Sequence, residues 1–137
     1  MASLPPPAWM VRLNVALLRS GAKIGSQYVL SVVGRRTGRL RTTPVSIVRV
    51  GPERYIVSAF PHAAWVINVR AAGAGTLGRG GQVEEVRMRE LPPGERGPVL
   101  RAFFQQVRGG RRFFGGQSAD QVVADAGTYP VFRVESA

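Results

Sequence analysis

Residues 34–44 read Gly-Arg-Arg-Thr-Gly-Arg-Leu-Arg-Thr-Thr-Pro, and this stretch joins two segments that look like β-strands. The segment before it, Tyr28–Val33, is apolar and rich in β-branched residues. The segment after it, Thr42–Val50, reads as a second strand, and Pro44 near its start favours an edge position that needs no ladder donor. Glycines at both ends of Gly34–Gly38 permit a sharp turn. The stretch therefore predicts a β-hairpin.

Four arginines fall within seven residues of this turn, namely Arg35, Arg36, Arg39 and Arg41. A tight turn exposes backbone N–H groups, which together with fixed guanidinium groups can form an anion pocket. Each charged hydrogen bond to a phosphate contributes roughly 1.5–3 kcal/mol, so two or three would hold a ligand at about micromolar affinity. A solvated basic hairpin tip without a ligand is the alternative interpretation.

Further strand patterns follow along the chain, at Tyr55–Ala59, Val83–Leu91 and Tyr129–Val134. Gly51-Pro52 forms the turn before the first of these. Leu77 and the Val83–Leu91 strand read as a hairpin around the glycine-rich stretch 78–81. The alternation of apolar and polar residues slips between Val83 and Val86, which predicts a β-bulge.

Helical patterns lie at the start, middle and late positions, over Ala8–Arg19, Ala63–Ala72, Pro98–Val107 and Ser118–Ala126. Glycines are placed to end the first three, Gly109-Gly110 in the case of the third, and Ser118 is a suitable N-cap for the fourth. The first helix, within an N-terminal helical segment 1–21, would pack over the sheet; an interfacial role against lipid or substrate is the alternative. With five or six strands, the pattern predicts a mainly β (α+β), antiparallel barrel with peripheral helices, as a single domain over 1–137.

The composition narrows the class of protein. The chain has 137 residues, a net charge of +11, no cysteine and a single lysine, Lys23. The excess of arginine has three interpretations. It could reflect a genome whose base composition favours arginine codons, it could serve to recognise phosphate or carboxylate groups, or it could attract nucleic acid or anionic lipid. No apolar run reaches the roughly 18 residues of a spanning helix, and the start lacks a signal-peptide pattern. The expected location is the cytoplasm, with peripheral membrane contact as an alternative.

The residues that could perform catalysis on their own are few. His62 is the single histidine, and a loop position beside Pro61 favours helix capping or solvent exposure. No cluster of His, Cys, Asp or Glu has ligand spacing, so no metal site is expected. Glu84 and Glu85 are adjacent on a predicted strand and should point to opposite faces. Any enzymatic reactivity must therefore come from a cofactor.

A second cluster, residues 64–70, reads Ala-Trp-Val-Ile-Asn-Val-Arg. Trp65 and Asn68 are three residues apart, so they share a face of the predicted helix. They could offer a stacking plane and an amide to one ligand. Taken alone, the cluster favours the simpler interpretation, in which Trp65 belongs to the core and Asn68 bonds to nearby backbone.

The two clusters, in this order, resemble the deazaflavin-dependent nitroreductase family, whose members adopt a split β-barrel and commonly use coenzyme F420. The resemblance rests on a Gly-Arg-(Lys/Arg)-(Ser/Thr)-Gly turn, an Arg-x-x-Pro strand, a small-residue strand end and a Trp-x-x-Asn helix. Here these motifs are 34–38, 41–44, 57–59 and 65–68, and the closing 130–132 stretch is similar as well. The resemblance covers about residues 8–135.

The resemblance implies a cofactor site and a redox reaction. A hydride would pass from reduced F420 to an electron-poor small molecule such as a quinone, a nitro compound or an activated alkene, with Ser58 or Tyr28 as hypothetical proton relays. Phe60, Phe113 and Phe114 would line an acceptor pocket or belong to the core. The implied cofactor residues are Arg35, Arg36, Thr37 and Arg41 at the phosphate; Thr42, Thr43, Pro44 and Val45 along the ring; Ser58 and Ala59 in close approach to it; and Ala64, Trp65 and Asn68 on the phosphate and ribityl side.

Two other interpretations remain at this point. The chain would be a related barrel that binds FMN, haem or a lipid without F420 chemistry. Alternatively it would be a basic module for nucleic acid or membrane, which the lack of aromatic residues among the arginines disfavours. Both a monomer and a homodimer are compatible with the resemblance.

Overall fold

The computed structural model describes residues 27–137. The N-terminal helix expected over Ala8–Arg19 lies outside this range. The described elements are β1 (Gln27–Val33), β2 (Leu40–Ser46), β3 (Val48–Val50), β4 (Glu53–Val57), α2 (Ala64–Ala72), β5 (Ala74–Arg79), β6 (Gln82–Glu90), η1 (Pro93–Glu95), α3 (Gly97–Gln106), α4 (Gly110–Phe113), α5 (Ala119–Ala124), η2 (Ala126–Thr128) and β7 (Val131–Ser136).

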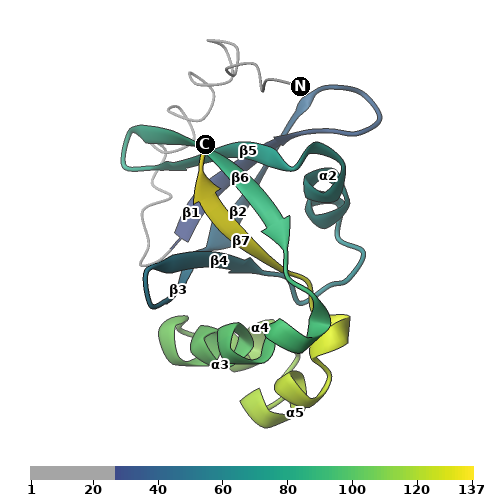
Figure 1. Cartoon of the computed structure of the whole chain (residues 1–137), viewed down its shortest axis with the longest axis vertical. Helices are drawn as coiled ribbons and strands as arrows, with labels where there is room; N and C mark the ends of the chain where they lie inside the picture. The colour runs from purple at the N-terminus through teal and green to yellow at the C-terminus, as the bar shows by residue number, and fades with distance from the viewer. Residues whose placement is uncertain (1–26) are drawn as a thin grey trace.

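The strands of the described chain form one seven-stranded sheet in the order β2-β1-β5-β6-β7-β4-β3 (Figure 1). Every pair of neighbours is antiparallel. The sheet curls so that the edge strand β2 also contacts β4. This is a split β-barrel with peripheral helices, as the sequence predicted.

The concave face of the sheet encloses the first of two cores. Period-2 alternation places Leu30 and Val32 of β1 on this face, with Val86 and Met88 of β6. Helix α2 lies against β1, β5 and β6 and adds Val66 and Val69 to the same core (Figure 1). The helix that carries Trp65 and Asn68 is therefore anchored to the strand that leads into the arginine-rich turn.

The second core lies on the other side of β3 and β4, beneath the late helices. Helix α3 packs on β3 and β4, and α5 packs on α3 (Figure 1). Phe103 and Leu100 of α3 are buried there against Val48 of β3. Five aromatic rings, those of Phe103, Phe104, Phe113, Phe114 and Tyr129, contact one another in pairs and stabilise this layer.

The strand expected over Thr42–Val50 is divided, because the chain crosses from one core to the other at Ile47. Val45 and Ile47 are buried in the first core, whereas Val48, the next residue, is buried in the second. Two consecutive buried residues cannot lie on one face of a strand. The chain therefore bends at Ile47 between β2 and β3.

The predicted bulge between Val83 and Val86 is wrong. The register of β5 with β6 is continuous from Gly78 opposite Val83 to Gly75 opposite Val86. The alternation slips because Glu84 occupies the concave face, where its carboxylate accepts two hydrogen bonds of 2.9 Å from Arg54. That pairing also holds the pKa of Glu84 below its usual value. Glu85 is exposed on the opposite face, as expected.

The two edges of the sheet are β2 and β3. Pro44 lies in β2, which confirms its predicted edge position. At the other edge, the Gln106 side chain of α3 bonds to the backbone of Arg49. Its Nε2 donates to the carbonyl of Arg49 at 2.6 Å and its Oε1 accepts from the Arg49 N–H at 2.8 Å. An amide side chain thus occupies the place of a neighbouring strand.

The late helices differ from expectation mainly at their ends. Helix α3 ends at Gln106, before the predicted Val107, and Gly110 begins the short α4 instead of closing α3. Ser118 caps α5 as predicted and forms a capping box with Gln121, but this helix ends at Ala124, not Ala126. Among the described residues, none of the helices has the length and hydropathy to cross a membrane.

Candidate functional site

The arginine-rich turn between β1 and β2 is closed by its own backbone. The Gly34 N–H donates to the Arg39 carbonyl at 2.7 Å, and the Gly38 N–H donates to the Gly34 carbonyl at 2.9 Å. Gly38 has φ 68°, in the left-handed region where glycine is favoured. The Thr37 hydroxyl accepts from the Arg39 N–H at 3.2 Å. These bonds fix the tip from which the arginine side chains project.

Arg35 of this turn is tied to Asn68 of α2, a residue 33 positions later. The Asn68 Oδ1 accepts from the Arg35 backbone N–H at 3.2 Å and from its Nη1 at 2.9 Å. Asn68 is only 4% exposed. Its partner is a distant residue, so the interpretation of Asn68 as a local backbone partner is wrong. The two sequence clusters are joined directly by this contact.

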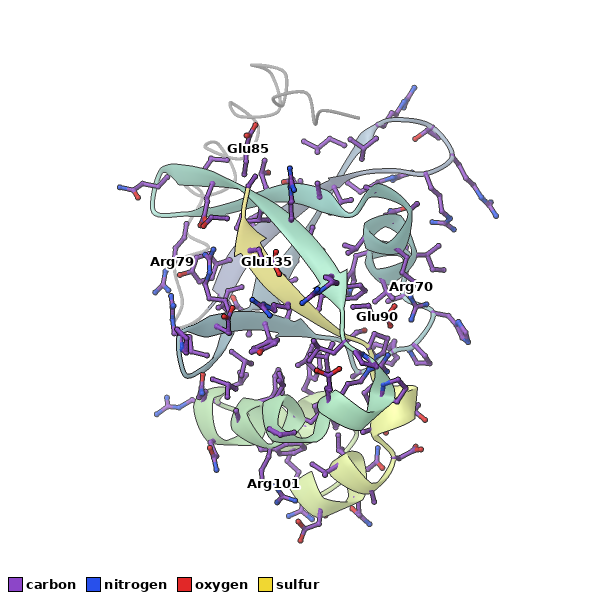
Figure 2. All side chains as sticks on the ribbon, in the orientation of Figure 1. Arg70, Arg79, Glu85, Glu90, Arg101 and Glu135 are labelled. Atoms are coloured by element: carbon purple, nitrogen blue, oxygen red, sulfur yellow. The ribbon has the colours of Figure 1, made fainter. Side chains whose placement is uncertain are left out.

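Helix α2 is itself held in place at its C-terminal half. Arg70 forms an ion pair with Glu90 of β6, with nitrogen–oxygen distances of 2.7 and 2.8 Å, and the two side chains meet beside α2 in Figure 2. The hydrogen bond from Arg70 lowers the pKa of Glu90. Gly73, with φ 67°, ends the helix and donates to the Val69 carbonyl. The position of Asn68 is thus set by the fold.

The turn and α2 enclose a cavity of about 550 Å³, here called the first cavity. Leu30, Val32 and Trp65 give it an apolar wall, and Trp65 also packs against Phe132 of the core. None of the described residues that line it is acidic. The lining is Leu30, Val32, Gly34, Arg35, Arg36, Thr37, Arg41, Thr42, Thr43, Ala64, Trp65 and Asn68.

A second cavity of about 520 Å³ lies next to the first. Trp65 lines both, and β2 passes from Thr42 and Thr43 in the first to its following residues in the second. Its other wall comes from the end of α3 and the turn into α4. The lining is Gln27, Pro44, Val45, Ser46, Val57, Trp65, Phe103, Val107, Arg108, Gly109, Arg112 and Phe113.

The structure thus brings together most residues singled out from the sequence. Trp65 belongs both to the wall of the cavities and to the margin of the first core. The residues expected at a cofactor divide as follows: Arg35, Arg36, Thr37, Arg41, Thr42, Thr43, Ala64, Trp65 and Asn68 line the first cavity, Pro44 and Val45 line the second, and Ser58 and Ala59 line neither.

The two residues considered as proton relays lie outside both cavities. The Ser58 hydroxyl is buried, donates to the Phe60 carbonyl at 2.8 Å and accepts from the Phe60 N–H at 3.1 Å. It therefore stabilises the turn after β4. The Tyr28 ring packs against the first core, with the Arg79 guanidinium 5.1 Å from its centroid. Neither side chain is among the residues that line the two cavities.

The remaining candidates separate into core and surface. Phe114 is buried in the second core, Phe113 lines the second cavity, and Phe60 is exposed and lines neither. His62 is exposed, in agreement with the sequence interpretation. No group of three or more potential metal ligands occurs among the described residues.

Sequence reasoning missed Arg108 and Arg112, which both line the second cavity. The signal was present in the stretch 108–112, which reads Arg-Gly-Gly-Arg-Arg and repeats the glycine–arginine character of the first turn. Leu30 and Val32 were missed as cavity residues because an apolar strand residue reads as core from sequence alone.

Comparison with known proteins places this architecture in a family. Among solved structures, an F420-H2 dependent reductase, FDR-A, is 21% identical with a TM-score of 0.59, over 80% of this chain and 94% of that one. A protein described as a domain-swapped dimer is 20% identical with a TM-score of 0.58, over 95% and 100%. The conserved hypothetical protein Rv2991 from Mycobacterium tuberculosis is 11% identical with a TM-score of 0.57, over 97% and 81%. These similarities show the same fold.

No curated protein matches the chain at a significant level. The family model described as F420H(2)-dependent quinone reductase matches residues 8–112. This range includes the arginine-rich turn, helix α2 and every residue that lines the two cavities except Phe113. The match confirms the deazaflavin-family resemblance seen in the sequence, and the chain belongs to the F420H(2)-dependent quinone reductase family.

Proposed function

We propose that this protein binds reduced coenzyme F420 in the first cavity and acts as an oxidoreductase toward a quinone or another electron-poor small molecule. The observation that carries the proposal is the contact between Arg35 and Asn68, which joins the arginine-rich turn and the Trp65 helix around one cavity. Family membership supports the same cofactor.

The donors of the first cavity fit the phosphate of the coenzyme. Arg36 and Arg41 have no carboxylate partner within residues 27–137, so their guanidinium groups are available to an anion. Arg35 is held by Asn68, and the Thr37 hydroxyl lies in the same wall. Arginine can give two parallel hydrogen bonds to phosphate oxygens. We assign the phosphate to these four residues.

The edge strand β2 fits the tricyclic ring. A strand with one neighbour leaves alternate backbone N–H and C=O groups outside the ladder, where they can bond to the polar edge of a ring. Thr42 and Thr43 line the first cavity and Pro44 and Val45 the second, so the strand runs along both, although Pro44 has no N–H and offers only its carbonyl oxygen. Trp65 supplies an apolar surface on the opposite side.

Bound F420 in its reduced form supplies a hydride to the acceptor. The contribution of the protein is to bind and orient the donor and to keep water away from it. Leu30, Val32 and Trp65 form the water-excluding wall, while the fixed turn holds the charged end. Both relay candidates lie outside the cavities, so we propose that the final proton comes from solvent.

FMN is the second candidate ligand, because it also carries a phosphate and a tricyclic ring. The residues assigned to the phosphate and to the apolar wall of the first cavity would suit either cofactor, since neither assignment depends on the ring atoms in which the two differ. Calorimetric titration of the full-length protein with F420 and with FMN decides between them. Tight binding of F420 supports the proposal. Preferential binding of FMN, or binding of neither, refutes it.

The phosphate assignment has its own test in two arginines of the same turn. Arg36→Ala should weaken F420 binding at least tenfold, since a lost charged contact costs over about 1.4 kcal/mol. Arg39→Ala is the matched control, because Arg39 carries the same charge on the same turn but does not line the cavity. Equal loss in both variants would contradict the assigned site and indicate a general effect of net charge.

A further inference from the structure

We infer that the second cavity is the acceptor site and that Arg108 and Arg112 make it selective for flat apolar acceptors that carry an acidic group, such as a carboxylate or sulfonate. This inference rests on the proposed function, and it names the class of acceptor that the reduced cofactor would meet.

The position of the second cavity suits a molecule that reacts with a ligand of the first. Trp65 lines both cavities. Thr43 lines the first and Pro44, the next residue of the edge strand, lines the second. A ring laid along β2 therefore reaches from one cavity to the other, and an acceptor in the second would lie beside it.

The surface of the second cavity suits an apolar ring. Pro44, Val45 and Val57 line one side, and Phe103 and Phe113 line the other. Phe113 is 44% exposed, and its ring centroid lies 5.0 Å from that of the buried Phe103. Phe113 is thus packed against the second core and still presents exposed apolar surface that a ligand can contact.

The backbone that carries the two arginines is shaped by glycines. Gly109 has φ 78°, and a Cβ on Gly110 would lie 3.3 Å from the Phe103 ring. The turn between α3 and α4 is therefore sharp and lies close against Phe103. This geometry brings Arg108, before the turn, and Arg112, after it, to the same cavity.

The charge of the cavity is positive and uncompensated. Within residues 27–137, neither Arg108 nor Arg112 has a hydrogen-bond or ion-pair partner for its side chain, whereas the neighbouring Arg111 donates to the Gly116 carbonyl at 2.8 Å. None of the described residues that line this second cavity is acidic. Two unpaired guanidinium groups at an apolar cavity favour a ligand that combines a ring with an anionic group.

A pair of quinones tests this selectivity on the full-length protein loaded with F420. The probes are 1,4-naphthoquinone and its 2-sulfonate. We expect the wild-type protein to prefer the sulfonate, and Arg108→Ala/Arg112→Ala to raise the KM for the sulfonate about tenfold, which is about 1.4 kcal/mol. The KM for the neutral quinone should change less than twofold. Arg49→Ala/Arg87→Ala is the control, since it removes the same charge at exposed positions that line neither cavity and form no ion pair within residues 27–137.

A second measurement, calorimetry of the sulfonate with cofactor-free protein, gives a readout besides activity. Weaker sulfonate binding in the cavity variant, with F420 affinity retained, supports the inference. An absence of preference in the wild type, an equal effect on both quinones, or a loss confined to F420 affinity would overturn it. Failure of F420 to bind would refute the proposed function, while sulfonate binding would still report on the two arginines.

Discussion

Replacement of Asn68 tests the contact on which the candidate site is built. Its Oδ1 accepts one neutral hydrogen bond, from the Arg35 N–H, and one charged bond, from the guanidinium. A neutral bond contributes about 0.5–1.5 kcal/mol and a bond to a charged group about 1.5–3 kcal/mol, and partial exposure reduces both. We expect Asn68→Ala to lower the free energy of unfolding by roughly 2 kcal/mol.

The same substitution should weaken F420 binding. Release of Arg35 removes one preorganised donor, which corresponds to about a tenfold loss of affinity. Asn68→Asp separates the two effects, since it keeps the acceptor for Arg35 and adds a negative charge beside the phosphate site. The aspartate variant should retain most of the stability but still lose affinity, because the new charge repels the ligand and neutralises Arg35.

Urea unfolding gives the stability of each variant, and calorimetry at constant ionic strength gives its F420 affinity. An Asn68→Ala protein with wild-type stability and affinity would refute the role assigned to this contact. An aspartate variant that binds F420 as tightly as the wild type would show that the phosphate lies elsewhere.

Three further predictions concern stability, each measured by urea unfolding. Gly75→Ala should cost about 1–3 kcal/mol, because the new Cβ would lie 2.5 Å from the Ser31 carbonyl oxygen across the β1–β5 pair; unchanged stability would contradict this close approach. Arg96→Met should cost about 3 kcal/mol, since Arg96 is 6% exposed and donates to four backbone carbonyls. For Glu84, the hydrogen bond from Arg54 lowers the folded-state pKa, so the pair stabilises the fold above the usual value of 4.5 and this contribution is lost as the pH falls through the folded-state pKa. Glu84→Gln should therefore lose less stability than wild type as the pH falls below 4.5, and an identical acid profile would argue against the pair.

The sequence predicted those features that local patterns encode. The turn 34–38 was evident from its glycines, and the edge position of Pro44 from the missing N–H. Helix α2 was expected within one residue of its observed start, because its apolar spacing and Gly73 are both local signals. The contact between Arg35 and Asn68 was beyond any local pattern, since it joins residues 33 apart.

Other features depend on which core a residue enters, and alternation alone does not carry that information. Ile47 and Val48 are both buried, but in different cores, so one expected strand became two. Strand β5 contains Gly75 and Gly78, which have no side chains to show a pattern, and it was represented only by Leu77. The second cavity depends on the docking of α3 and α4 against the sheet, which no local signal predicts.

The two hydrogen bonds between the Gln106 side chain and the Arg49 backbone also affect how copies of the chain can associate. An exposed sheet edge is a template for a strand from another molecule. At β3, such a strand would have to displace an amide that already satisfies both backbone groups. Within residues 27–137, the other edge of the sheet is β2, the same strand that lines both cavities. A ligand bound along β2, as proposed for F420, would therefore compete with the pairing of β2 from a second copy of the chain.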